Sequence, residues 1–303
     1  MSLQARGSTT NAELILWAQK LFARLYPEYL RVGPWHPVAR ASLAALLLAL
    51  AASRRRAFEA ADSQASDDRG KPLLTSKALR AFRAAGALWG CSLLASSLWH
   101  EGWWPMVSYT MQSWTLMTTR YVLGTLELHD AGSSPSSGRW RQAVSRFNEA
   151  LRFPSLVQNS ITVVVWWTVL VPIILALYGK DARRRAAFQK FNMSFALLNF
   201  HGMNLPLAAA DHLLSPRRLL PSDLWLAIAS ATAYVLFYLS VLDSRGLHLY
   251  IILSPRTKFS AVSTGSILAC YFALHRLWDR AARSALEFQR QPSASVAGPA
   301  SRA

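Results

Sequence analysis

Apolar residues occur along this chain in long blocks without charge, separated by basic stretches. Blocks close to the length of a bilayer-crossing helix, about 20 residues, occupy 84–100, 102–119, 153–179, 191–210, 224–242 and 259–275. Neither a buried soluble bundle nor a signal peptide accounts for so many blocks, so the pattern predicts an all-α integral membrane bundle of about six spans. The expected transmembrane domain covers 37–288, with spans near 82–100, 103–125, 155–179, 191–214, 222–242 and 258–278.

A seventh apolar block is shorter. It covers 41–53, only 13 residues (ASLAALLLALAAS), before Arg54, and extending it upstream crosses Arg40 and Pro37. This block could be a short span near 38–53, a re-entrant segment or a helix on the membrane surface.

The first 36 residues differ from the blocks that follow. Within 11–30, apolar residues recur at helical spacing, at Leu14, Trp17, Leu21 and Leu25. This spacing predicts an N-terminal amphipathic helix. It is either an interfacial helix of the mature protein or, since acidic residues are few there, an organelle targeting sequence.

Polar segments divide the remaining blocks. The charged stretch 54–80, broken by Gly70 and Pro72, predicts an extramembrane loop, and the Ser-, Gly- and Pro-rich stretch 130–142 predicts a second loop. The tail, 289–303, has the composition of a disordered segment.

The composition narrows the function classes. The net charge is +17, from 33 Lys and Arg against 16 Asp and Glu, and the basic residues lie between the apolar blocks. This distribution favours contact with anionic membrane lipids over binding of nucleic acid. Cys91 and Cys270 lie inside apolar blocks and predict no disulfide, and the sequence has no motif for a metal ion or other cofactor.

Inserting a charged side chain at the centre of a membrane span costs about 2.5–3.5 kcal/mol of free energy, so polar residues inside a span point to functional or packing sites. The segment 191–214 is the richest, with Asn192, Asn199, His201, Asn204, Asp211 and His212. At about 100° per residue, His201, Asn204 and Asp211 share one helix face, which predicts that they line a cavity or fix helix packing. Pro206 is expected to kink this helix.

A second polar span, 105–129, contains Tyr109, Thr110, Gln112 and Arg120. The hydroxyl of Thr110 becomes a nucleophile only if a histidine can accept its proton. His201 is the candidate for this role, and Asn204, on the same helix face, is a further candidate catalytic residue. Tyr109, Gln112, Asn199 and Asp211 are the further candidates for a polar cavity. Arg120 is expected to reach the interface or to pair with an acid such as Glu127. We expect interfacial positions for Asp243, His248 and His275.

Two segments carry a resemblance to a known family: SYTMQSWTLMTTRY, and NFHGMNLPLAAADHLL followed by PSDLWLAIASATAYVLFYL. Over roughly 82–278 the chain resembles the androgen-inducible membrane hydrolases and their rolling-stone and plant relatives. The later YIILS segment is similar to a tyrosine-containing family segment. The family has about six transmembrane helices, and its animal enzymes hydrolyse fatty acid esters of hydroxy fatty acids with an intramembrane Thr and His.

This resemblance implies that Thr110 is the nucleophile. The catalytic histidine of the animal enzymes is the second one of an HGMH-like motif, where this chain reads His201, Gly202, Met203 and Asn204. Asparagine cannot exchange a proton as imidazole does. Either His201 acts instead, or this branch has lost or changed the activity.

Two functions therefore remain open. The first is a membrane hydrolase of lipid esters that uses Thr110, His201 and Asn204. The second is a non-catalytic subunit or accessory factor with protein partners in a membrane complex. An endomembrane or plasma membrane location is favoured, and a mitochondrial or plastid membrane stays open.

Overall fold

A computed structural model of the chain describes residues 16, 19–20, 26–64, 73–129 and 138–290. Across these ranges the regular elements are all helical and no β-strand occurs, as the sequence predicts. Most of the predicted amphipathic helix at 11–30, and the predicted disordered tail from 291 onward, lie outside the described residues. Residues 289 and 290 still belong to the last helix.

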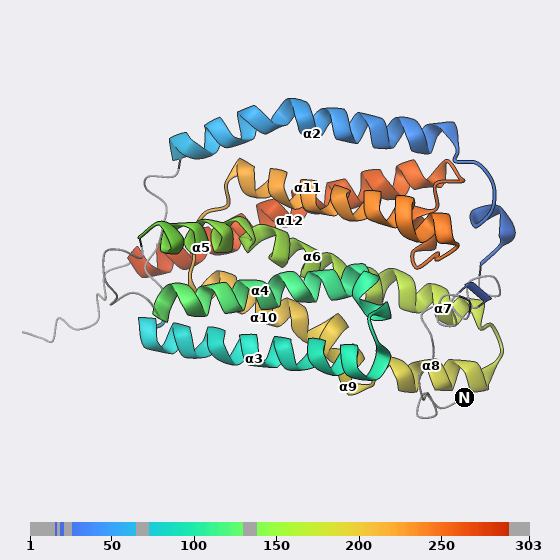
Figure 1. Cartoon of the computed structure of the whole chain (residues 1–303), viewed down its shortest axis with the longest axis horizontal. Helices are drawn as coiled ribbons and strands as arrows, with labels where there is room; N and C mark the ends of the chain where they lie inside the picture. Colours follow the sequence, from blue (N-terminus) through green and yellow to red (C-terminus); the bar gives the residue numbers. More distant parts are fainter. Residues whose placement is uncertain (1–15, 17–18, 21–25, 65–72, 130–137, 291–303) are drawn as a thin grey trace, which may run out of the picture.

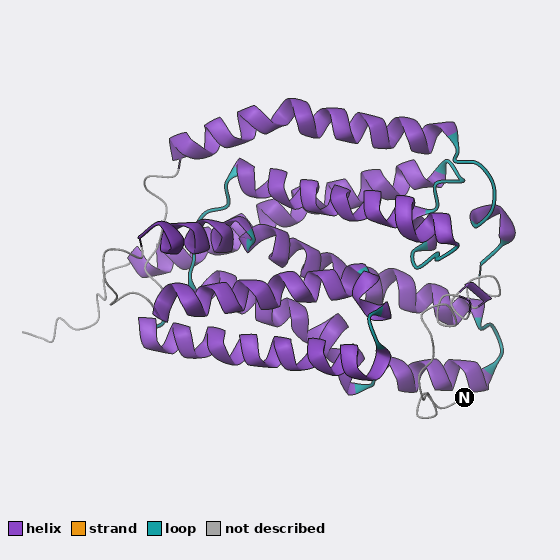
Figure 2. Ribbon diagram, in the orientation of Figure 1, coloured by secondary structure: helices purple, strands orange, loops and turns teal. Residues whose placement is uncertain are grey.

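Long helices run side by side and their connections gather at the two ends of the bundle (Figures 1 and 2). The unbroken ones are α2 (Pro37–Gln64), α3 (Ser76–Glu101), α4 (Tyr109–His129), α11 (Pro221–Phe237) and α12 (Phe259–Arg290). The shorter elements include η2 (Glu28–Leu30), η3 (Trp104–Val107), α8 (Ala182–Asn192), η8 (Tyr238–Leu242), η9 (Asp243–Arg245) and η10 (Ile251–Leu253).

Two further rods are composite and contain π-helical turns. One joins α5 (Gly138–Ala150), α6 (Arg152–Val165), the π-helical η6 (Trp166–Leu170) and α7 (Val171–Leu177). The other joins α9 (Phe195–Leu198), the π-helical η7 (Asn199–Met203) and α10 (Asn204–Leu214). A proline follows η6 and η7, Pro172 in α7 and Pro206 in α10, whereas the π-helical η8, which follows α11, is continued by Asp243. Because a π turn accommodates the missing N–H of a proline, both interruptions lie where the sequence weakens the α-helical ladder.

Three helices among the described residues are long and apolar enough to cross a membrane: Pro37–Ala60, Gly138–Leu177 and Pro221–Arg245. The short block 41–53 thus lies within a helix of membrane-crossing length. The loop predicted from residue 54 starts too early, since α2 continues past the arginines to Gln64. Charged residues such as Arg and Glu are good helix formers, and Arg55 pairs with Glu59 one turn later at 2.6 Å.

The core is built around α4. Trp114, in its N-terminal half, is fully buried, and its Nε1 donates to the Gly90 carbonyl of α3 at 3.2 Å. The two helices approach so closely that a Cβ on Gly90 would clash with the Thr118 hydroxyl. On its other side α4 packs against α6, which in turn packs against α10 and α11. Helix α4 is therefore held rigidly between α3 and α6.

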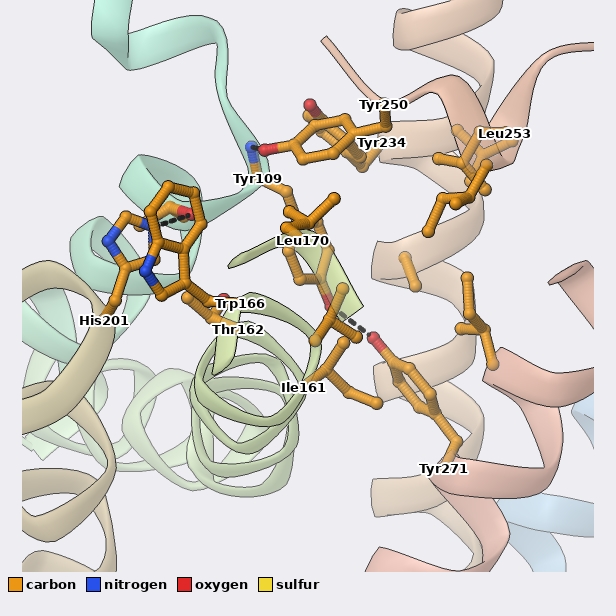
Figure 3. A pocket seen from close by; sticks show the side chains of 16 residues that line it. Tyr109, Ile161, Thr162, Trp166, Leu170, His201, Tyr234, Tyr250, Leu253 and Tyr271 are labelled. Carbon is orange, nitrogen blue, oxygen red and sulfur yellow. Dashed lines mark hydrogen bonds between the residues drawn. The ribbon is translucent and has the colours of Figure 1, made fainter. Parts of the chain in front are cut away.

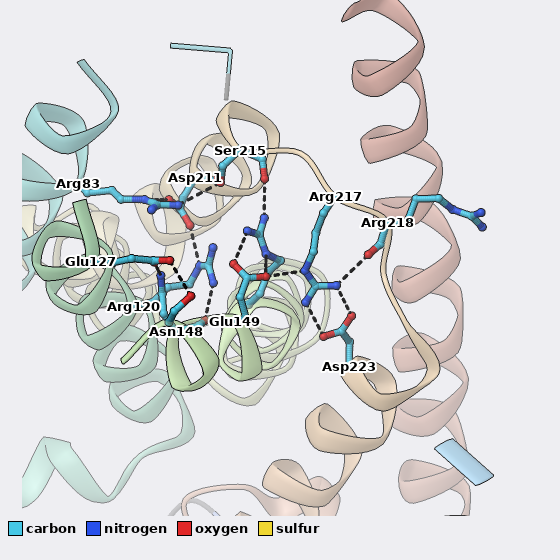
Figure 4. A network of polar contacts seen from close by, with 12 residues as sticks. Arg83, Arg120, Glu127, Asn148, Glu149, Asp211, Ser215, Arg217, Arg218 and Asp223 are labelled. Atoms are coloured by element: carbon cyan, nitrogen blue, oxygen red, sulfur yellow. Dashed lines mark hydrogen bonds and ion pairs between the residues drawn. The ribbon is translucent and has the colours of Figure 1, made fainter. Parts of the chain in front are cut away.

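An arginine network ties the helices together at the end of the bundle where α4 and α10 finish (Figure 4). Asp211 of α10 accepts from Arg83 Nε of α3 at 2.7 Å and from Arg120 Nε of α4 at 2.6 Å. The expected pairing of Arg120 with Glu127 is wrong. Glu127 instead accepts from Ser145 and Asn148 of α5.

A second part of this arginine network is centred on Arg217, in the connection between α10 and α11. Its guanidinium donates to both carboxylate oxygens of Asp223 at 2.8 Å and to Glu149 at 2.6 Å. Burial alone would lower the pKa of Arg217, but its hydrogen bonds to Asp223 and the negative charges of Asp223 and Glu149 hold that pKa above its ordinary value. Arg217 is thus a permanent cation that fixes α11 to the α5–α6 junction.

Candidate functional site

A cavity of about 80 Å³ lies in the half of the bundle opposite the arginine network. We call it the site cavity (Figure 3). Its wall is mainly aliphatic and aromatic, and a few hydroxyl groups and one imidazole face it. The lining residues come from α4, α6, η6, η7, α11, α12 and the connection before α12; they are Tyr109, Thr110, Ile161, Thr162, Val165, Trp166, Leu170, His201, Ala231, Tyr234, Val235, Tyr250, Ile252, Leu253, Ile267 and Tyr271.

Thr110 and His201 meet at the wall of this cavity. The Thr110 Oγ1 lies 3.2 Å from the His201 Nε2, although the two residues are 91 positions apart in the chain. Thr110 is the second residue of α4, whose first turn is capped by Ser108, the hydroxyl of which accepts from the Met111 N–H at 3.2 Å. The nucleophile candidate therefore stands on a capped helix start, where N–H groups create a positive electrostatic potential.

The His201 ring is held by tryptophans of the neighbouring rod. It stacks on Trp166 with ring centroids 3.9 Å apart and planes 19° apart, and Trp167 Nε1 donates to the His201 carbonyl at 2.6 Å. His201 Nδ1 is buried and has no hydrogen-bond partner among the described residues. Trp166 and His201 both belong to π-helical turns, which often occur at functional sites.

Tyr250 brings a third group to the threonine. Its hydroxyl accepts from the N–H of Tyr109, the residue before Thr110, at 2.9 Å, and Tyr250 and Thr110 both line the site cavity. Burial raises the pKa of Tyr250 and outweighs the opposing effect of these backbone and side-chain contacts, so the phenol keeps its proton. A protonated phenol beside Thr110 can donate a hydrogen bond to a bound group.

The segment that carries Tyr250 is fixed by a buried ion cluster. Asp243 accepts from Arg256 at 2.8 Å and 2.9 Å, and His248 Nδ1 lies 3.0 Å from the same carboxylate. The cluster closes the connection between η8 and α12 into a compact turn. Asp243 and His248 are both buried within the protein, where each satisfies polar groups of the other.

Tyr109 also lines the site cavity, as predicted for a polar cavity residue. Its hydroxyl lies 2.8 Å from that of Tyr271 of α12, which joins α4 to α12 across the cavity (Figure 3).

The other predicted site residues lie elsewhere. Asn204 is fully buried, does not line the site cavity, and its Oδ1 accepts from the adjacent Leu205 N–H at 2.9 Å. Asn199 accepts from Trp89 Nε1 of α3 at 3.1 Å, and Gln112 is half-buried and also lies off the cavity wall. Asp211 belongs to the arginine network.

Sequence reasoning missed the aromatic part of this site. Trp166 lies in an apolar block, where tryptophan is typical of the membrane interface, and Tyr271 had no distinguishing signal. Tyr250 lies in the YIILS segment that the family resemblance had singled out, and this was the one available signal.

The described residues contain no group of three His, Cys, Asp or Glu side chains placed to hold a metal ion. Comparisons of the chain with protein-family models, with curated proteins and with solved structures find no match.

Proposed function

We propose that this protein is an integral membrane hydrolase that cleaves lipid esters, with Thr110 as the nucleophile and His201 as the base. The observation that carries the proposal is the 3.2 Å separation of Thr110 Oγ1 and His201 Nε2 at the wall of a mainly apolar cavity. A hydroxyl is a weak nucleophile until a base within hydrogen-bond reach takes its proton. The distance fulfils this requirement, and the apolar wall suits a lipid substrate.

The proposed reaction has two half-reactions. His201 Nε2 takes the Thr110 proton while Oγ1 attacks the ester carbonyl carbon, and the tetrahedral intermediate collapses with loss of the alcohol, which receives that proton. The product is an acyl ester of Thr110. Water then attacks the acyl carbon after His201 removes its proton, which releases the fatty acid and restores the threonine hydroxyl.

Tyr250 is proposed to stabilise the oxyanion of each tetrahedral intermediate. Tyr250 lines the same cavity as Thr110, and its oxygen already accepts from the N–H of the adjacent Tyr109. A phenol whose oxygen accepts a hydrogen bond becomes a stronger donor through its own proton. The N-terminus of α4 adds a positive potential at the same place.

In this proposal the chain crosses the bilayer about six times, with α2 as a candidate seventh crossing. Besides α2, the helices Gly138–Leu177 and Pro221–Arg245 have sufficient length and hydropathy, and α3 with 26 residues, α4 with 21 and α12 with 32 are each about long enough to span the hydrocarbon layer. The rod of α9, η7 and α10 is the proposed sixth crossing. An endomembrane or plasma membrane remains the favoured location. Membrane lipids are the proposed substrates and surroundings.

An acyl-threonine intermediate gives the direct test. Purified protein in detergent is incubated with p-nitrophenyl octanoate, quenched in acid and digested, and the peptide that contains Thr110 is examined by mass spectrometry. We expect an added octanoyl group on Thr110, none in Thr110→Ala, and release of p-nitrophenol only by the wild-type protein. Equal turnover by folded Thr110→Ala would refute the proposal. No turnover by either protein would favour the non-catalytic subunit.

Replacing Tyr250 with phenylalanine removes one hydroxyl and keeps the ring. Loss of an oxyanion donor lowers kcat by roughly 10²–10³-fold. We expect a fall of that order in the steady-state kcat, with KM changing little because the donor acts mainly on the intermediate. Tyr238→Phe is the matched control, since Tyr238 also contacts Tyr250 through its hydroxyl but does not line the site cavity. An unchanged kcat in Tyr250→Phe would remove Tyr250 from the mechanism.

A further inference from the structure

Two smaller cavities adjoin the site cavity and are not explained by the Thr110–His201 pair. The middle cavity, of about 40 Å³, lies between α2, α11 and α12. The outer cavity, of about 50 Å³, lies near the N-terminal ends of α2 and α12, where Trp35, Ala39 and Ser260 line it. Val235 of α11 and Leu253 of η10 line all three cavities. The cavities are therefore neighbours, divided by the side chains that they share.

The polarity of the lining changes along this row. The catalytic pair and the hydroxyls of Tyr109, Tyr234 and Tyr250 belong to the site cavity alone. The middle cavity is lined mostly by aliphatic side chains of α11 and α12, such as Ile228, Ile267 and Leu268. The outer cavity is lined by apolar side chains together with the hydroxyl residues Ser42, Ser260 and Thr264. A ligand that fills the site and middle cavities must therefore be polar at its end beside the catalytic pair and apolar in the part that follows. A methylene chain with an ester at one end has this distribution.

The row runs toward an edge of the bundle. Helix α2 lies along the outside of the bundle, and it packs mainly on α11 and α12 (Figure 1). No residue in the apolar window of α2 is buried inside the protein, so this helix covers the cavities from the lipid side. A lipid chain that moves between α2 and its neighbours would meet Leu43 and Leu46 of α2, which line the outer cavity.

We propose that the three cavities form one channel for a single long acyl chain, which enters beside α2 and reaches the Thr110–His201 pair with its ester group. The binding of the chain stands on the cavities alone. Only the position of the ester rests on the proposed function. Val235 and Leu253 are the side chains that must move apart, and a linear chain suits such narrow gaps better than a branched or ring-shaped ligand.

Photolabelling tests the binding separately from hydrolysis. The full-length Thr110→Ala protein in lipid nanodiscs is irradiated with hexadecanoic acid that carries a mid-chain diazirine and a terminal alkyne. We expect labelled residues in α2, α11 and η10 near Leu46, Val235 and Leu253, and competition by unlabelled hexadecanoic acid. Label spread evenly over lipid-facing residues such as Leu48 and Phe272, without competition, would overturn the channel.

A blocked channel supplies the matched comparison. Val235→Trp puts a large ring between all three cavities, whereas Leu236→Trp, on the next residue of α11, lies at an exposed position outside them. We expect Val235→Trp to lower photolabelling roughly tenfold, since each buried methylene adds a several-fold factor to binding. Leu236→Trp should label as Thr110→Ala does, with both variants checked for folding by size-exclusion chromatography. Equal labelling of the two tryptophan variants would contradict the proposal.

Turnover separates the two proposals. In a protein with an intact Thr110, Leu46→Trp, at a residue that lines the middle and outer cavities but not the site cavity, should reduce cleavage of p-nitrophenyl hexadecanoate about tenfold and leave p-nitrophenyl butanoate nearly unchanged, because only the long chain needs the channel. Turnover of both esters that does not respond to Leu46→Trp would reject the channel and keep the hydrolase. If unlabelled hexadecanoic acid competes with the photolabelling but the protein turns over neither ester, the channel would be kept and the hydrolase rejected.

Discussion

Asp211→Asn is expected to lower the free energy of unfolding by about 3–5 kcal/mol, the typical effect of removing one partner of a buried ion pair. The carboxylate receives Arg83 at 2.7 Å and Arg120 at 2.6 Å, and all three side chains are almost completely buried. Asparagine keeps the shape but leaves two guanidinium groups without a counter-charge. Unfolding by sodium dodecyl sulfate in mixed micelles, followed by circular dichroism, measures the change.

The control for Asp211 is an exposed pair. Glu59→Gln breaks the Arg55–Glu59 pair on α2, whose side chains are 88% and 60% exposed. Surface pairs of this kind contribute about 0–1 kcal/mol, so the unfolding curve should hardly move. A loss in Asp211→Asn no larger than in Glu59→Gln would mean that the arginine network does not stabilise the bundle.

His201→Gln should lower esterase turnover by roughly 10²–10⁴-fold, the usual contribution of a general base. Glutamine fills much of the space beside Trp166 but cannot take the Thr110 proton. The measurement is kcat/KM for p-nitrophenyl octanoate, per molecule that elutes as folded protein. Turnover in His201→Gln within a few-fold of the wild-type value would show that another group is the base.

Two further variants show whether this loss is specific. His212→Gln removes another buried histidine, whose ring contacts Trp278 of α12 and not the site cavity, so its turnover should stay near the wild-type value. Asn204→Ala examines the position where the resembled family has its histidine. Since Asn204 does not line the site cavity, we expect a change of only a few-fold. A large loss in Asn204→Ala together with normal turnover in His201→Gln would reverse the assignment.

Much of the fold follows from the sequence because helices in apolar surroundings satisfy their own backbone groups. The charge-free blocks identify the segments that become α3, α4, α6, α11 and α12. Helix ends are less predictable. The arginines after residue 53 end the apolar pattern, but α2 continues to Gln64. Charged side chains prefer water to hydrocarbon, but they do not break the backbone hydrogen bonds of the helix that carries them.

The site was predictable only in part. Hydroxyl and imidazole groups in apolar blocks single out Thr110 and His201, but their contact depends on how two helices pack, which no local pattern contains. The same holds for Asp211 and Arg120, which are 91 positions apart, and explains why the nearer Glu127 was the wrong expected partner. Asn204 was grouped with His201 through a regular spacing of about 100° per residue, a spacing that holds only in an unbroken α-helix.

The π turn at η7 breaks that regularity. Within it, the rod brings His201 to Thr110, and after it, α10 brings Asp211 to Arg83 and Arg120. One extra residue in a turn rotates everything beyond it by about 100°. The turn therefore sets the angle about the helix axis between the part of the rod that carries His201 and the part that carries Asp211. Local chain length at 199–203, as much as side-chain identity, determines whether both halves meet their partners at once.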